Sequence, residues 1–162
     1  PDNLSVIYGM DFGFNDPTTC ISVAIDNKSK KVYAKEIFYK SGVLAEDVYT
    51  HIHKEIGYSL VLGDAAKIDD IARLQNMGLN IEKCFKGGGL NGSSILAGIK
   101  AMKEFDLIID KDSLNLINEL NNYCWDIRKV ETPIDKYNHA LDALRYVVYD
   151  NELNTSGDLC LA

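Results

Sequence analysis

The architecture of this chain can be built outward from LSVIYGMDFG, residues 4–13. Its first seven residues, Leu4–Met10, are mostly apolar and include β-branched members, which is typical of a buried strand. The run ends in Asp11-Phe12-Gly13. We therefore expect a buried first strand that delivers the carboxylate of Asp11 at its end.

Two further strand-like runs follow. Thr18–Ile25 and Val32–Tyr39 are rich in β-branched and aromatic residues, which favour strands. The polar stretch Asp26–Lys31 between them indicates a turn, so the two runs should pair as an antiparallel hairpin. The chain is thus predicted to open with a three-stranded antiparallel meander.

Helices and strands alternate after the meander. Val48, Ile52 and Ile56 recur at four-residue spacing and predict a helix over Val43–Ile56, which Gly57 ends. The later predicted elements are a strand over Ser59–Gly63 that ends at Asp64, a helix over Ile68–Met77, a strand over Ile81–Phe85, a glycine-rich loop over Gly87–Gly92, a helix from Ser93 or Ser94 to about Phe105, a short extended segment over Leu107–Ile109, and helices over Ser113–Tyr123 and Tyr137–Tyr149.

This order of elements indicates an α+β or α/β pattern, and we predict the α/β class, with one mixed sheet of five or more strands flanked by helices. The 162 residues, 46% of them hydrophobic, suffice for one substantial core. We expect a single domain over 1–162, with an ordered core over about 4–150 and a fraying polar tail over 151–162. Because the chain opens at Pro1 without an initiator Met or a signal segment, we also expect a piece of a larger protein.

Composition argues against several kinds of site and partner. No window is both long and apolar enough to cross a bilayer, so we expect a soluble protein without a membrane partner. The formal net charge of -7 argues against a free-standing, tight DNA binder, because Lys and Arg supply most non-specific affinity for phosphates. This objection weakens if the acidic residues bind cations or if another domain holds the DNA.

We expect buried, reduced thiols rather than zinc ligands or disulfides for the four scattered cysteines, Cys20, Cys84, Cys124 and Cys160.

Three carboxylates are placed where chemistry is expected. Asp11 and Asp64 end predicted strands, and Asp142 lies mid-way in the last predicted helix, so all three can reach one edge of the sheet. Clustered carboxylates repel one another unless cations intervene, and their oxygens favour Mg²⁺ or Mn²⁺. Two such ions about 3.5–4 Å apart would activate a water and stabilise the leaving oxygen of a phosphodiester. The implied chemistry is phosphodiester hydrolysis.

A histidine accompanies the third carboxylate. His139 precedes Asp142 by three residues, which puts both side chains on one helix face. His139 could therefore contact metal, water or phosphate. A role limited to packing or hydrogen bonding within the helix layer stays open, because a lone histidine is weak evidence.

Three segments carry a resemblance to a known family. GMDFGFNDPT (9–18), LGDAA (62–66) and YNHALDALRY (137–146) resemble, in order and spacing, the three nuclease motifs at the C-terminal end of phage large terminase subunits. Tyr123-Cys124-Trp125 also resembles the family's helix-then-strand segment, so the similarity runs from Ile7 to Tyr149. The resemblance implies an RNase H-like fold, in which parallel strands extend an antiparallel meander.

The same resemblance implies an activity and its residues. Asp11, Asp64 and Asp142 would bind two Mg²⁺ or Mn²⁺ ions, and His139 would assist. The enzyme would be a metal-dependent endonuclease that cuts concatemeric double-stranded DNA when packaging starts and when it ends. Its partners would be an N-terminal packaging ATPase domain, the portal and the small terminase subunit, in the cytoplasm of a bacterial host. One departure is Lys67, where many relatives are acidic; this lysine could instead meet a phosphate.

Other functions fit parts of the pattern. A resolvase or transposase nuclease with the same triad stays open. An actin-like or sugar-kinase ATPase fragment also begins with a strand that ends in Asp-x-Gly, but Asp64-Ala65-Ala66 lacks the glycine of its second phosphate turn. A protein kinase would need a glycine-rich loop and His-Arg-Asp before its Asp-Phe-Gly, and neither precedes Asp11-Phe12-Gly13 here. All three carboxylates and His139 are retained, which argues against a non-catalytic scaffold.

Asp16 is expected only to organise its turn. Little sequence specificity is expected, because no base-reading element is apparent.

Overall fold

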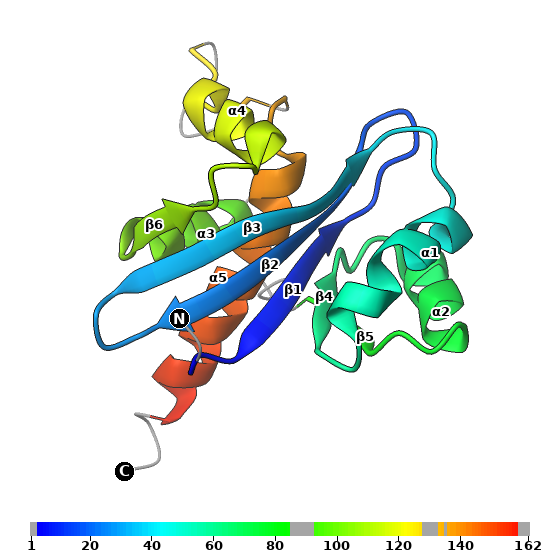
Figure 1. The fold of residues 1–162 in the computed structure, drawn as a ribbon. Helices are drawn as coiled ribbons and strands as arrows, with labels where there is room; N and C mark the ends of the chain where they lie inside the picture. The colour runs from blue at the N-terminus through cyan, green and yellow to red at the C-terminus, as the bar shows by residue number, and fades with distance from the viewer. Residues whose placement is uncertain (1–2, 85–92, 128–132, 135, 159–162) are drawn as a thin grey trace.

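The computed structural model of the chain describes residues 3–84, 93–127, 133–134 and 136–158. Six strands lie within them: β1 (Val6–Asp11), β2 (Thr18–Asp26), β3 (Lys31–Lys40), β4 (Val61–Gly63), β5 (Ile81–Lys83) and β6 (Asp106–Ile109). They form one sheet in the order β5-β4-β1-β2-β3-β6 (Figure 1). The strands β1, β2 and β3 pair antiparallel, whereas β4, β5 and β6 pair parallel to their neighbours. The predicted meander and mixed sheet are confirmed.

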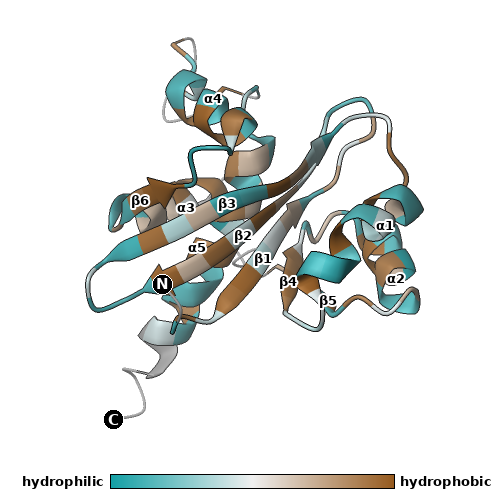
Figure 2. Ribbon diagram, in the orientation of Figure 1, coloured by the Kyte–Doolittle hydropathy of each residue, from teal (hydrophilic) through white to brown (hydrophobic). Residues whose placement is uncertain are grey.

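The described part of the chain also holds five helices: α1 (Ala45–Ile56), α2 (Ile68–Asn76), α3 (Ser93–Lys103), α4 (Leu114–Asn122) and α5 (His139–Asp158). α1 and α2 pack on one face of the sheet, and α3 and α5 pack on the other (Figure 1). Side chains alternate between these faces: Val61 belongs to the core beside α1 and α2, and Leu62 belongs to the core beside α5. Figure 2 shows the hydrophobic residues gathered on the strands and hydrophilic ones at the β2–β3 turn. The sheet therefore has a separate core on each face.

The last helix differs most from its prediction. α5 begins at His139 and continues to Asp158, nine residues beyond the predicted end at Tyr149. Polar side chains support the extension: the Thr155 hydroxyl donates to the Asn151 carbonyl at 2.8 Å. The side-chain amides of Asn151 and Asn27 also exchange hydrogen bonds of 3.1 and 3.0 Å, which tie α5 to the β2–β3 turn.

The cysteines match their prediction in part. Cys20 and Cys84 are buried, but Cys124 is exposed, because it lies just beyond the end of α4. Cys160 lies outside the described residues, as do Phe85 and the predicted glycine-rich loop over 87–92. No helix in the part of the chain that the structure describes is long and apolar enough to cross a membrane.

Candidate active site

Asp11 and Asp64 leave the sheet side by side. β1 and β4 are parallel neighbours in which Met10 pairs with Gly63, so one of the two carboxylates follows each member of that pair. The Asp64 amide donates to the Met10 carbonyl at 3.1 Å, which ties the loop after β4 to β1. Two of the three predicted metal ligands therefore share one edge of the sheet.

The third carboxylate reaches this edge on α5. The helix lies directly against β1 at Gly9, where a Cβ would overlap the carbonyl oxygen of Ala143. The Thr19 hydroxyl donates to the His139 carbonyl at 3.1 Å and anchors the start of α5 to β2. Asp142 lies in the first turn of α5 rather than mid-way along it, because the helix begins at His139, two residues later than predicted, and continues to Asp158.

Two side chains of α5 hold the nearly buried carboxylate of Asp11. His139 Nδ1 lies 3.1 Å from Asp11 Oδ2, and the Tyr146 hydroxyl donates to Asp11 Oδ1 at 3.2 Å. The hydrogen bond with Asp11 is the main cause that raises the pKa of His139, and partial burial opposes it. His139 is therefore in contact with a predicted metal ligand.

Tyr146 lies near all three carboxylates. Burial raises the pKa of its hydroxyl, and the charges of Asp11, Asp142 and Asp64 raise it further. The charges of all three carboxylates therefore act on the buried hydroxyl of Tyr146. The sequence prediction missed Tyr146, although its position four residues after Asp142 and seven after His139 places it on the same helix face.

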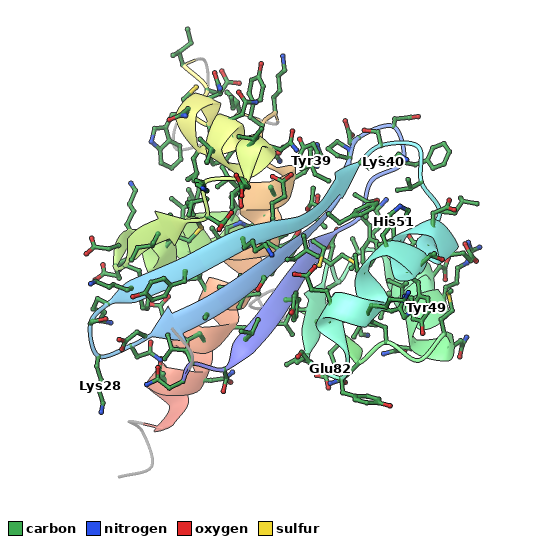
Figure 3. All side chains as sticks on the ribbon, viewed as in Figure 1. Lys28, Tyr39, Lys40, Tyr49, His51 and Glu82 are labelled. Atoms are coloured by element: carbon green, nitrogen blue, oxygen red, sulfur yellow. The ribbon has the colours of Figure 1, made fainter. Side chains whose placement is uncertain are left out.

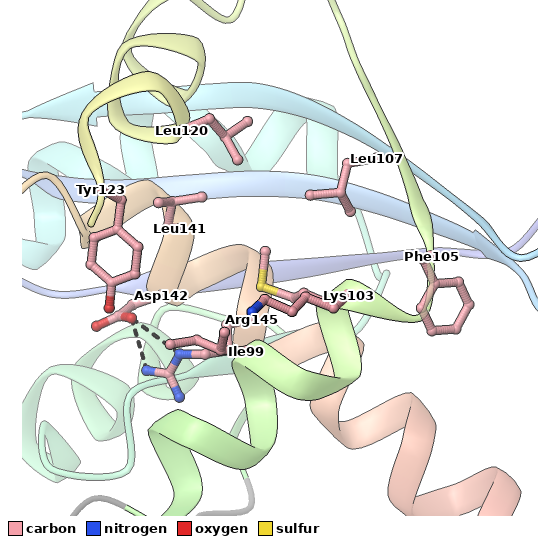
Figure 4. A pocket seen from close by; sticks show the side chains of 10 residues that line it. Ile99, Lys103, Phe105, Leu107, Leu120, Tyr123, Leu141, Asp142 and Arg145 are labelled. Atoms are coloured by element: carbon pink, nitrogen blue, oxygen red, sulfur yellow. Dashed lines mark hydrogen bonds and ion pairs between the residues drawn. The ribbon is translucent and has the colours of Figure 1, made fainter. Parts of the chain in front are cut away.

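Asp142 forms an ion pair with Arg145, one turn along α5 (Figure 4). Arg145 Nε and Nη2 lie 3.1 and 2.8 Å from Asp142 Oδ1. Burial raises the pKa of Asp142, and the guanidinium partly offsets this effect. The pair keeps a charged carboxylate tolerable in a largely buried position.

The three carboxylates supply the hard oxygen donors that Mg²⁺ and Mn²⁺ prefer. Each is already held by protein groups, which are His139 and Tyr146 for Asp11, the Ala66 amide for Asp64, and Arg145 for Asp142. Among the described residues, no three His, Cys, Asp or Glu side chains are arranged ready to hold a metal ion. The donor set fits a divalent cation in chemical kind, and the metal-binding roles stay a prediction.

Two glutamates that sequence reasoning missed hold the starts of α5 and α4. Glu119 of α4 is buried, and its carboxylate accepts from the Leu141 amide at 3.0 Å and from the Tyr39 hydroxyl at 3.0 Å. Figure 3 labels Tyr39 at the end of β3. Glu36 of β3 in turn accepts from the Leu116 amide of α4 at 2.9 Å. Each carboxylate thus accepts a hydrogen bond from the N-terminal turn of a later helix, and no local pattern marks either residue.

The remaining predicted residues have other places. Asp16 has no hydrogen bond among the described residues, so its expected turn-organising role is wrong: the Thr18 hydroxyl closes that turn on Gly13 instead. Oδ1 of Asp16 lies 3.9 Å from Nε2 of His139, at the rim of the site. Lys67 is exposed at the start of α2, where it lines a small pocket beside Phe12.

The chain is similar to known proteins over most of its length. Residues 11–150 match the family described as "Terminase RNAseH like domain". The "Terminase, large subunit" of Escherichia phage T5 is 24% identical over 154 residues, 88% of this chain and 34% of that protein. The chain thus spans about a third of the length of this curated relative.

Two solved structures share the fold. The nuclease domain of the P22 large terminase has a TM-score of 0.74 and 20% identity over 90% of this chain and 80% of its own. The g2p (large terminase) nuclease domain of bacteriophage SPP1 "with bound Mn" has a TM-score of 0.71 and 26% identity over 88% of this chain and 84% of its own. These likenesses confirm the RNase H-like fold that the motifs predicted.

Proposed function

The chain belongs to the family of terminase RNase H-like domains, and from this premise we propose that it is a divalent-metal-dependent endodeoxyribonuclease. The observation that carries the proposal is geometric: Asp11 and Asp64 come directly after the paired residues Met10 and Gly63, and α5, which carries Asp142, contacts Asp11 through His139 and Tyr146. The family membership favours this function over a resolvase, a transposase or an actin-like ATPase fragment.

Mg²⁺ or Mn²⁺ would be held by Asp11, Asp64 and Asp142. Bound metal would activate a water and stabilise the leaving oxygen of a phosphodiester, for which two ions suffice. The manganese bound in the SPP1 relative supports a divalent metal. Because Asp11 and Asp64 follow neighbouring parallel strands, the sheet itself fixes the spacing of two ligands.

The chain's own groups orient this set. His139 and Tyr146 each hold one oxygen of Asp11, which restricts rotation of the carboxylate. The other ring nitrogen of His139 lies on the side of exposed Asp16, where it can hydrogen-bond a water or a phosphate oxygen of the DNA. His139 is therefore assigned to substrate or water, and Tyr146 to positioning.

The role in the virus is also a proposal. A large terminase nuclease would cut concatemeric double-stranded DNA at the start and at the end of packaging, with little sequence preference. An ATPase domain of the same protein, the portal and the small terminase subunit would be its partners, in the cytoplasm of the host. A domain with a net charge of -7 would depend on these partners to hold the DNA.

The test is plasmid nicking and linearisation by the purified domain with Mn²⁺, Mg²⁺ or EDTA. Asp11→Asn, Asp64→Asn and Asp142→Asn should each abolish cleavage. The matched control is Asp106→Asn. Asp106 is an exposed aspartate of β6, and it pairs with Lys31 at the end of β3 that lies far from the site. Thermal unfolding of each variant checks the fold. Cleavage that survives EDTA, or that survives any of the three substitutions, contradicts the proposal.

A further inference from the structure

An apolar pocket of about 280 Å³ lies between α3, β6, α4 and α5, and the Asp142–Arg145 pair forms part of its wall (Figure 4). The Arg145 side chain is only 8% exposed. Beside it in the wall lie apolar side chains such as Ile99 and Leu141, together with Lys103. A guanidinium in such surroundings is held where its hydrogen bonds place it.

Both hydrogen bonds from Arg145 fall on the same oxygen of Asp142. Nε and Nη2 each donate to Oδ1, and no hydrogen bond from a described residue falls on Oδ2. Two donors of one rigid planar group fix both the position and the rotation of the carboxylate. One oxygen is thereby left for another partner.

The place of Arg145 is itself set by a glycine. A Cβ on Gly98 of α3 would lie 2.5 Å from Arg145 Cγ and 2.7 Å from Cδ. These atoms belong to the middle of the side chain and cannot move away without carrying the guanidinium with them. Only glycine at position 98 leaves room for this conformation of Arg145.

We propose that Arg145, seated against Gly98, is a positioning residue that occupies Oδ1 of Asp142 and presents Oδ2 as a single-oxygen ligand to the metal. This inference rests on the proposed function, because it gives Asp142 a metal to bind. Arg145 would not touch the metal or the DNA. Ligating carboxylates are commonly held by such hydrogen bonds, and removal of the partner weakens metal binding about 10–100-fold.

Mn²⁺ binding to the DNA-free domain, followed by the electron paramagnetic resonance of free Mn²⁺, tests the proposal. Arg145→Lys keeps the charge but loses the planar pair of donors, so it should weaken Mn²⁺ binding about 10-fold or more. Lys103→Gln is the control, because it removes a cation from the same pocket without a bond to Asp142. It should leave Mn²⁺ affinity unchanged or slightly higher.

Gly98→Ala supplies an independent variant that leaves Arg145 in the sequence. It should also weaken Mn²⁺ binding, and the loss should disappear when Arg145→Ala is already present. In cleavage assays, Arg145→Lys should require more Mn²⁺ for half-maximal rate at an unchanged KM for DNA. Circular dichroism confirms that each variant is folded.

The outcomes separate two failures. Arg145→Lys with the Mn²⁺ affinity of the wild type, or equal weakening by Lys103→Gln, overturns the role of Arg145 and leaves the proposed function standing. A wild-type domain that binds no Mn²⁺, or that binds it equally well as Asp142→Asn, overturns the proposed metal site itself.

Discussion

Gly9→Ala tests the idea that contact between α5 and β1 sets the geometry of the site. A Cβ on Gly9 would lie 2.6 Å from the carbonyl carbon of Ala143 and would overlap its oxygen. Ordinary contacts between carbon atoms are about 3.5 Å or longer, so relief of this contact alone moves α5 away from β1 by roughly 0.9 Å, and the nearer oxygen requires more. The obstacle is helix backbone, which cannot rotate out of the way as a side chain can.

Both stability and activity should fall. Overpacking costs about 1–3 kcal/mol, and the rigid obstacle places Gly9→Ala at about 3 kcal/mol. For a chain of this size each kcal/mol lowers Tm by about 2–4 °C, so we expect a decrease of about 6–12 °C. A retreat of about 1 Å or more also moves His139 and Asp142 away from Asp11, and a misplacement of about 1 Å can lower the cleavage rate about 100-fold.

The assay combines thermal unfolding with Mn²⁺-dependent plasmid cleavage well below the Tm of the variant. Gly57→Ala is the matched control: its φ of 58° strains any side chain, and nothing lies within 4 Å of the added Cβ. Backbone strain should cost about 1–3 kcal/mol there without loss of cleavage. Gly9→Ala with wild-type cleavage, or equal rate losses in both variants, would refute the assigned role of the α5–β1 contact.

Two further predictions concern the start of α5. Glu119→Ala leaves the Leu141 amide and the Tyr39 hydroxyl without their acceptor, at about 1–3 kcal/mol each, whereas Glu119→Gln keeps an acceptor and should lose much less in urea unfolding. Equal losses would contradict the capping role. Because Asp11 raises the folded-state pKa of His139, protonated His139 stabilises the metal-free protein below its ordinary pKa of 6.5, and this stabilisation is lost as pH rises through the raised pKa. Unfolding in EDTA should therefore show a steeper fall in stability from pH 6 to pH 8.5 for wild type than for His139→Gln; parallel pH profiles would contradict it.

The parts of this site that the sequence predicted are those with a local signal. Asp11 and Asp64 each follow an apolar run, and the pairing of parallel strands then brings two strand ends together. Asp142 and His139 share a helix face through their spacing alone. The residues that hold these groups carry no such signal, because Glu119 contacts α5 only after α4 has folded back over the sheet.

The ends of elements were harder to predict for a related reason. α5 continues past Asn151, and there the Asn151 side chain hydrogen-bonds Asn27, which is 124 residues away in the sequence. The position of β6 at the edge of the sheet likewise depends on the connection that returns the chain beside β3. Neither contact leaves a periodic pattern in the residues themselves, so composition alone indicated a polar tail.

One helix carries nearly all of the chemistry outside the two strand ends. Asp142, its partner Arg145, and both groups that hold Asp11 lie within the first eight residues of α5. The Gly9 contact, the Thr19 hydrogen bond and the Glu119 carboxylate fix that segment from three directions. A small shift of α5 therefore changes every distance in the site at once, while the two cores on either face of the sheet lose little of their buried surface. For this reason, substitutions that move α5 should reduce both cleavage and stability, whereas a substitution that strains the backbone away from α5, such as Gly57→Ala, should reduce stability alone.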